Sequence, residues 1–281
     1  MEECTHNCDT CSANCGSKGT GNEAKIEKLK LGKGSKIKKI IGVSSGKGGV
    51  GKSFVTSLLA SGLSKKGFKV GILDADILGP SIPKSFGIID KQILANDDGL
   101  MIPKESLHGI KVMSSNLLLE DDSTPIIYRG VLIAGVLQQF YQETFWGDLD
   151  FLFIDMPPGT GDVPLTTYQS IPIDKVVIVS SPQDLVSMIV KKSINMADMM
   201  KIDVLGIIEN MSYVACPNCD EKIEIFGKSN IDTVAEENNI QVLAKLPMRV
   251  EYSKMVDEGM VEDIDIEELD NTIDLISRLI K

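Results

Sequence analysis

The chain has 281 residues, 43% of them hydrophobic, which is enough to bury the core of one large α/β domain or two small ones and excludes disorder throughout. A formal net charge of −11, from 40 acidic and 29 basic residues, argues against non-specific nucleic-acid binding, which needs clustered lysines and arginines. The same charge opposes docking on anionic lipid, so we expect neither a nucleic-acid nor a membrane partner.

The first residues lack the basic and then apolar regions of a secretory signal peptide. No apolar run approaches the roughly 20 residues that are needed to span a bilayer. We therefore expect a cytoplasmic protein. Because thiols are kept reduced in that compartment, clustered cysteines indicate metal ligands or redox groups rather than structural disulfides.

Residues 1–35 are polar and glycine-rich, which predicts a cysteine-rich metal-binding module followed by a linker. Its cysteines are Cys4, Cys8, Cys11 and Cys15. A helix would separate the first and last of them by roughly 16 Å, at about 1.5 Å per residue, so the segment must instead fold around its metal. Four thiolates suit a [4Fe–4S] cluster or Zn²⁺, and the spacing does not choose between them. A metal-free thiol tail is the alternative.

From residue 36 onward, short apolar runs alternate with helical stretches, which predicts one domain over residues 36–281. Continuous runs such as Val176–Val179 are typical of strands buried on both faces, so we expect an α/β fold with a mostly parallel sheet and helices on both faces. The expected strands are Lys39–Val43, Lys69–Leu73, Ile110–Met113, Asp150–Ile154, Lys175–Val179, Val204–Ile208 and Gln241–Leu246. The expected helices are Lys52–Lys66, Tyr128–Phe145, Val186–Met200, Ile231–Asn238 and Glu267–Ile280.

A phosphate-binding loop of pattern G-x-x-x-x-G-K-S lies between the first expected strand and the first expected helix. Its glycines let backbone N–H groups surround phosphate oxygens. The lysine is expected to reach the β and γ phosphates of ATP, and the serine hydroxyl to ligate Mg²⁺. A glycine-rich turn without a ligand is the alternative. The predicted nucleotide-binding residues are Gly46, Lys47, Gly48, Gly49, Val50, Gly51, Lys52 and Ser53.

Acidic residues follow two of the expected strands. Asp155 ends the apolar run Phe151–Ile154, at the edge of the sheet where ligands bind in open α/β folds, and this suits a Walker B role. Asp74 and Asp76 follow Val70–Leu73 in the same way. Either carboxylate could instead cap a helix. The glycine- and proline-rich segment that begins at Asp155 indicates a loop that senses the γ-phosphate.

Cys216 and Cys219 form a C-x-x-C pair late in the chain. Such a pair supplies two ligands, whereas a tetrahedral or cubane site usually needs four. Two chains together supply four, which predicts a metal centre on the axis of a homodimer. A redox dithiol is the alternative, although the surrounding sequence lacks a thioredoxin layout.

Lys47, directly after the first glycine, makes the loop similar to that of the deviant Walker A ATPases. Three segments extend the likeness, namely Gly46–Ser53, Asp74–Pro83 and Ile154–Asp162. Together with Glu209–Tyr213, which leads into the C-x-x-C pair, they resemble the Mrp-type iron–sulfur carrier ATPases over residues 37 to 281.

The resemblance implies a MinD-like fold and a homodimer that holds a labile [4Fe–4S] cluster on its paired C-x-x-C motifs and transfers it to apo iron–sulfur proteins. It implies that Lys47 reaches the partner's nucleotide, that Asp76 orients the attacking water, and that Asn210 contacts the adenine. With Lys52 and Asp155, these residues form the expected ATPase site. The N-terminal cysteines resemble a ferredoxin-like extension of related scaffolds, but with more compact spacing, so Zn²⁺ stays an alternative there.

Two other functions are compatible with the loop. A positioning ATPase like MinD or ParA needs a basic amphipathic tail or a basic DNA-facing surface, whereas the tail Glu262–Asp270 is acidic. An ATP-gated electron-transfer protein would keep its cluster. Since neither a MinD nor a ParA role explains six clustered cysteines, we expect a slow ATPase whose hydrolysis is coupled to cluster binding and transfer.

Overall fold

The computed structural model describes residues 28–77, 79–89, 92–118, 130–183, 186–216, 219 and 221–280. The predicted cysteine module, with Cys4, Cys8, Cys11 and Cys15, lies outside the described residues. Within the predicted linker, Leu29 and Leu31 pack against the core, and the Leu29 amide donates to the Ser170 carbonyl at 2.9 Å. The boundary at residue 35 stays a prediction.

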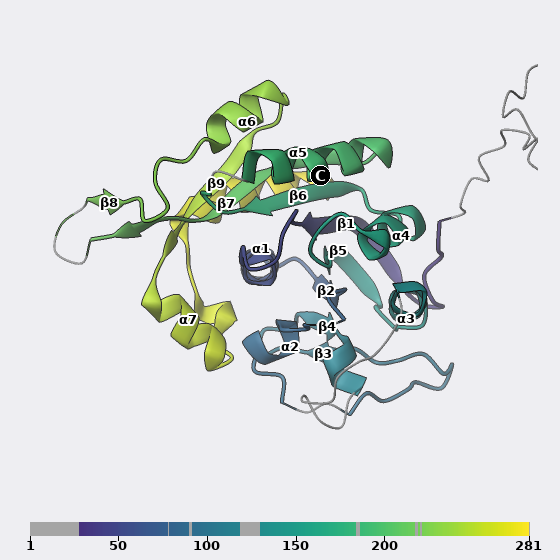
Figure 1. The fold of residues 1–281 in the computed structure, drawn as a ribbon. Coiled ribbons are helices and arrows are strands. Elements are labelled where there is room, and N and C mark those ends of the chain that lie inside the picture. Colours follow the sequence, from purple (N-terminus) through teal and green to yellow (C-terminus); the bar gives the residue numbers. More distant parts are fainter. Residues whose placement is uncertain are drawn as a thin grey trace, which may run out of the picture.

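A mixed, mostly parallel sheet forms the centre of the molecule, as predicted (Figure 1). Its order is β3-β4-β2-β5-β1-β6-β7-β8, with β9 also paired to β7. Only the β3–β4 and β7–β8 pairs among the described strands are antiparallel. The strands are β1 Lys36–Ser44, β2 Val70–Asp74, β3 Lys104–Glu105, β4 Lys111–Met113, β5 Asp148–Asp155, β6 Lys175–Ser180, β7 Asp203–Ala215, β8 Lys222–Ile223 and β9 Val242–Met248.

Helices cover both faces of this sheet (Figure 1). One core cluster joins it to α3, α4, α5 and α6, and a second joins it to α1 and α8. The helices are α1 Lys52–Lys65, α2 Ile82–Ser85, α3 Gly130–Gln142, α4 Asp162–Ser170, α5 Val186–Met199, α6 Ile231–Glu237, α7 Val250–Asp257 and α8 Asp270–Ser277. Short 3₁₀ helices span Ser115–Leu118, Val261–Asp263, Glu267–Leu269 and Arg278–Ile280. No described helix is long and apolar enough to cross a bilayer.

The central strands are apolar at consecutive positions because both of their faces are buried. In β6, Val176 and Ile178 belong to the first core cluster, whereas Val177 and Val179 belong to the second. Successive side chains of a strand point to opposite faces, so a strand with helices on both sides needs an unbroken apolar run.

Several elements differ from the sequence-based prediction. The short elements α2, α7, β3 and β8 were not expected. Helix α4 was not expected, because it starts at the end of the glycine-rich loop and contains Pro164, which the first turn of a helix tolerates. Strand β7 was expected to end at Ile208 but continues to Ala215. Its interior residues Glu209 and Asn210 are polar, which is typical of a strand end, yet both are buried.

Candidate nucleotide and thiol site

The phosphate-binding loop connects β1 to α1, in the strand–loop–helix context that the sequence predicts. Gly49 and Gly51 adopt left-handed backbone angles, with φ of 77° and 79°, which glycine adopts without steric cost. Gly51 is also the residue that precedes the first helical turn. The loop's amides therefore lie at a helix N-terminus, where the helix dipole favours an anion.

A cavity of about 320 Å³ opens on this loop. It lies at the carboxyl ends of β1 and β2, the edge where open α/β sheets bind ligands. Its lining residues are Ser45, Lys47, Gly48, Gly49, Val50, Gly51, Lys52, Ser53, Phe54, Asp76, Ser81, Ser85, Pro158 and Val256. The cavity thus contains seven of the eight predicted loop residues and one predicted catalytic aspartate.

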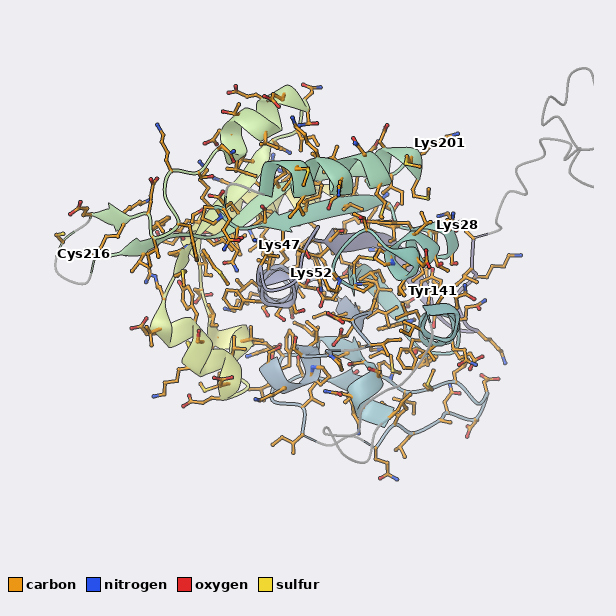
Figure 2. All side chains as sticks on the ribbon, in the orientation of Figure 1. Lys28, Lys47, Lys52, Tyr141, Lys201 and Cys216 are labelled. Atoms are coloured by element: carbon orange, nitrogen blue, oxygen red, sulfur yellow. The ribbon has the colours of Figure 1, made fainter. Side chains whose placement is uncertain are left out.

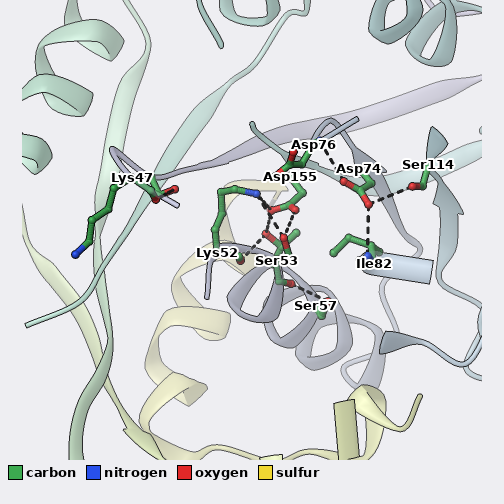
Figure 3. Close-up of polar contacts among 11 residues, drawn as sticks. Lys47, Lys52, Ser53, Ser57, Asp74, Asp76, Ile82, Ser114 and Asp155 are labelled. Atoms are coloured by element: carbon green, nitrogen blue, oxygen red, sulfur yellow. Dashed lines mark hydrogen bonds and ion pairs between the residues drawn. The ribbon is translucent and has the colours of Figure 1, made fainter. Parts of the chain in front are cut away.

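Lys52, Ser53 and Asp155 meet in a partly buried polar cluster (Figure 3). The Lys52 Nζ lies 2.8 Å from Asp155 Oδ1, and the two side chains are 6% and 0% exposed. The Ser53 hydroxyl donates to Asp155 Oδ2 at 2.5 Å, and the Thr56 hydroxyl donates to Oδ1 at 2.7 Å. A hydroxyl beside a carboxylate is the hard oxygen donor set that Mg²⁺ prefers, so the cluster fits that ion.

The two aspartates after β2 have different surroundings. Asp74 is fully buried and accepts hydrogen bonds from the Ser114 hydroxyl at 3.2 Å and the Asp76 amide at 3.2 Å. Burial, and then the charge of Asp155, raise the pKa of Asp74 to about 7, although Lys52 opposes the shift. Asp76 lines the cavity instead. Of this pair, Asp76 is therefore the carboxylate placed to face a nucleotide.

Replacing Asp74 by asparagine should change how stability depends on pH. Folded Asp74 titrates near 7, well above its ordinary range, so the folded state holds a proton that the unfolded chain loses near pH 4. The wild type should lose stability relative to Asp74→Asn as pH rises from about 4 to about 7, by at most about 1.4 kcal/mol per pH unit. Above that range the difference should level off. Urea unfolding of both proteins across this range measures it, and a constant difference would contradict the assignment.

Lys47 lies apart from the buried cluster. Its amine donates to the Gln183 side-chain oxygen on the loop after β6, and Figure 3 shows it directed away from Lys52 and Asp155. Gln183 was not among the residues predicted from the sequence. Thr56 and Ser114 were also missed, although Thr56 lies one helical turn beyond Ser53 and could have been suspected from that spacing.

Asn210 is held against the phosphate-binding loop. Its side chain is buried, and Nδ2 donates to the Val50 carbonyl at 2.9 Å. Asn210 lies within its strand, because β7 continues for five residues beyond it. Contact with an adenine stays a prediction.

Alanine at Gly51 should cost more stability than alanine at Gly49. Both residues have nearly the same positive φ, which costs an L-residue about 1–2 kcal/mol. A Cβ at Gly51 would lie 2.2 Å from Asn210 Nδ2, whereas a Cβ at Gly49 would meet nothing within 4 Å. The clash with a buried, bonded amide should add about 1–3 kcal/mol. Urea unfolding compares the two variants, and equal losses would mean that Asn210 yields without cost.

The thiol pair belongs to the hairpin formed by β7 and β8, and Figure 2 shows Cys216 on an arm that extends from the sheet. Cys216 directly follows β7 and is half-buried, Cys219 is exposed, and neither forms a disulfide. The arm is closed by the antiparallel pairing of β7 with β8 and by the Cys216 amide, which donates to the Glu221 carbonyl at 3.0 Å. In the described part of the chain, no three histidine, cysteine or acidic residues are grouped to hold a metal. The pair therefore offers two thiol groups as possible metal ligands.

Comparison with known proteins gives relatives across the whole domain. The chain is 46% identical over 264 residues to the iron–sulfur cluster carrier protein of Clostridium perfringens, covering 92% of each chain. It is 43% identical to an Archaeoglobus fulgidus nucleotide-binding protein solved with ADP and cobalt, with a TM-score of 0.75 over 83% of this chain and 91% of that one.

The MinD-like fold is also confirmed. The cell-division ATPase MinD of Pyrococcus furiosus matches with a TM-score of 0.61 at 18% identity, covering 86% of this chain and 99% of that one. The ParA family model described as NUBPL iron-transfer P-loop NTPase matches residues 36–280. Since that match spans the phosphate-binding loop, the buried aspartates and the thiol arm, the chain belongs to this family of iron-transfer P-loop NTPases.

Proposed function

We propose that the protein is an ATP-dependent iron–sulfur cluster carrier that works as a homodimer. Each chain contributes Cys216 and Cys219, and the four thiolates hold a [4Fe–4S] cargo that is passed to apo iron–sulfur proteins. The observation that carries this proposal is a thiol pair that directly follows the strand in contact with the phosphate-binding loop, without a third grouped ligand in the described chain. Relatives with the name iron–sulfur cluster carrier protein support it.

ATP would bind in the cavity at the loop, with the glycine amides around its phosphates. Lys52 would exchange its ion pair with Asp155 for the β and γ phosphates, and Asp76 would orient the attacking water. Ser53 and Asp155 would hold Mg²⁺, which when bound neutralises the charge that develops on the phosphates. Hydrolysis would be slow, because its role is to reset a conformation.

Lys47 supports the dimer in this proposal. Its amine points away from the Lys52–Asp155 pair of its own chain and rests on an exposed glutamine. A lysine in that position can extend toward a nucleotide bound to the partner chain. A single two-fold axis would then bring the two thiol pairs together and place each Lys47 near the nucleotide of the other chain.

The remaining assignments follow from this function. The N-terminal cysteines would hold a second [4Fe–4S] cluster or Zn²⁺, as a module joined by a linker to the ATPase domain over residues 36–281. The protein would act in the cytoplasm, where thiols stay reduced.

Anaerobic reconstitution of the full chain with iron and sulfide tests the proposal. Analysis of iron, sulfide and zinc per dimer identifies the cargo, and mixing with an apo iron–sulfur enzyme shows whether the cargo leaves. We expect restored enzyme activity that rises with Mg·ATP. A cluster that cycles in oxidation state but stays bound would favour electron transfer, and a protein without a cluster on Cys216 and Cys219 would contradict the proposal.

A further inference from the structure

The centre of β7 lies between the nucleotide loop and the thiol arm. Asn210, in the middle of the strand, is bonded to the loop through the Val50 carbonyl at 2.9 Å. Cys216 follows the last residue of the same strand. Six residues of one strand therefore connect the two sites, a path of roughly 20 Å.

Met211 interrupts this strand. It has a φ of 59°, a left-handed backbone angle that is sterically unfavourable for a residue with a long side chain. The other described non-glycine residues with positive φ, Lys201 and Asn239, lie in turns after helices. The pairing of β7 with β9 also shifts register between Glu209 and Tyr213. A strained backbone and a shift of register thus occur within the same five residues of this strand.

The structure is anchored on both sides of Met211. Before Met211 in the chain, Glu209 is buried and accepts hydrogen bonds from the Ser212 and Ser229 hydroxyls. After Met211, the Tyr213 hydroxyl donates to Glu268 Oε1 at 2.6 Å. Such flanking contacts are what a strained residue needs in order to persist.

The Met211 side chain also lies close to the nucleotide loop. Its Cε lies 3.8 Å from the place that a Cβ on Gly51 would take. A conformational change in the loop would therefore act on the strand at both Asn210 and Met211. The residues that follow Met211 lead directly to Cys216.

We propose that Met211 is a positioning residue whose left-handed turn sets the place of Cys216 according to the state of the nucleotide loop. The strand on the loop side would follow Val50 and Gly51, and the strand on the arm side would carry Cys216. This inference rests on the proposed function, because it supplies the link by which ATP controls the thiol pair.

A single-thiol protein tests the inference. With Cys4, Cys8, Cys11, Cys15 and Cys219 replaced by serine, the reaction of Cys216 with an aromatic disulfide reports its surroundings. We expect a non-hydrolysable Mg·ATP analogue to change the rate constant about fivefold or more, a typical allosteric coupling. In Met211→Gly, which adopts the same φ without strain but also tolerates many other backbone angles, the strand has a flexible joint at this point, and this ratio should fall to about one.

Three comparisons make the result specific. Asn239 has a φ of 53° and lies outside the strand, so Asn239→Gly removes backbone strain elsewhere in the protein. This variant should keep the full effect of the nucleotide on the reaction of Cys216. Met211→Ala shortens the side chain that lies near Gly51 but still places an L-residue at this positive φ, so it should also keep the full nucleotide effect. The affinity for the nucleotide analogue should be unchanged in Met211→Gly, so that a lost response is not lost binding.

The inference is overturned if Met211→Gly responds to nucleotide like the parent protein, or if Met211→Ala loses the response equally. It is also overturned if the parent shows no nucleotide effect on Cys216. Each of these results leaves the carrier proposal intact, because cluster binding and transfer are measured separately in the reconstituted chain. Failure of reconstitution would contradict the carrier proposal alone.

Discussion

Replacing Cys216 by alanine is expected to remove the bridging cluster while leaving the fold intact. Each chain offers two thiols in this hairpin, Cys216 and Cys219, so Cys216→Ala removes two of the four ligands from a symmetric dimer. The hairpin should survive because the bond from residue 216 to the Glu221 carbonyl is made by a backbone amide. We expect a stability change within about 1 kcal/mol, as for a half-buried residue without a special role.

The measurement uses full-length protein in which Cys4, Cys8, Cys11 and Cys15 are serine, so that iron bound at the N-terminus does not contribute. Iron, sulfide and visible absorbance after anaerobic reconstitution should fall to the level of the untreated protein. Ile223→Ala is the matched control, because it truncates a 47% exposed side chain on the same hairpin without removing a thiol. Iron retained in Cys216→Ala, or lost equally in Ile223→Ala, would contradict bridging by the thiol pair.

Local patterns made the fold and much of the nucleotide site predictable. Strands β5 and β6 are apolar at consecutive positions because helices cover both faces of the sheet. This pattern can be read directly from the sequence. The loop at Gly46–Ser53 has a spacing that few other structures require. Asp155 could be placed beside Ser53 because carboxyl ends of parallel strands share one edge of the sheet.

The rest depends on tertiary contacts that a single sequence does not reveal. Glu209 and Asn210 resemble a strand end, and only the serines and the Val50 carbonyl that satisfy them explain why β7 continues to the thiol pair. By position alone, Asp74 and Asp76 both follow β2, and only the family resemblance singles out Asp76. Burial against Ser114 makes the surroundings of Asp74 different, and that partner lies 40 residues away in the chain.

Replacing Lys52 by methionine should nearly abolish nucleotide binding. Lys52 is expected to make two charge-assisted hydrogen bonds to phosphate, each contributing about 1.5–3 kcal/mol. Their loss corresponds to a fall in affinity of at least about 100-fold, since 1.4 kcal/mol is tenfold. Titration calorimetry with Mg·ADP and a non-hydrolysable ATP analogue measures this, and unchanged affinity would refute the assignment of the loop.

The same substitution should also destabilise the nucleotide-free protein, because Lys52 is the counter-ion of a carboxylate with no exposed surface. Removing one partner of a buried ion pair costs about 3–5 kcal/mol. Asp155→Asn added to Lys52→Met should recover most of that stability but none of the affinity, which separates folding from binding. Lys65→Met is the matched control on the same helix. Its ion pair with Asp265 is largely exposed, so it should cost at most about 1 kcal/mol and leave affinity unchanged.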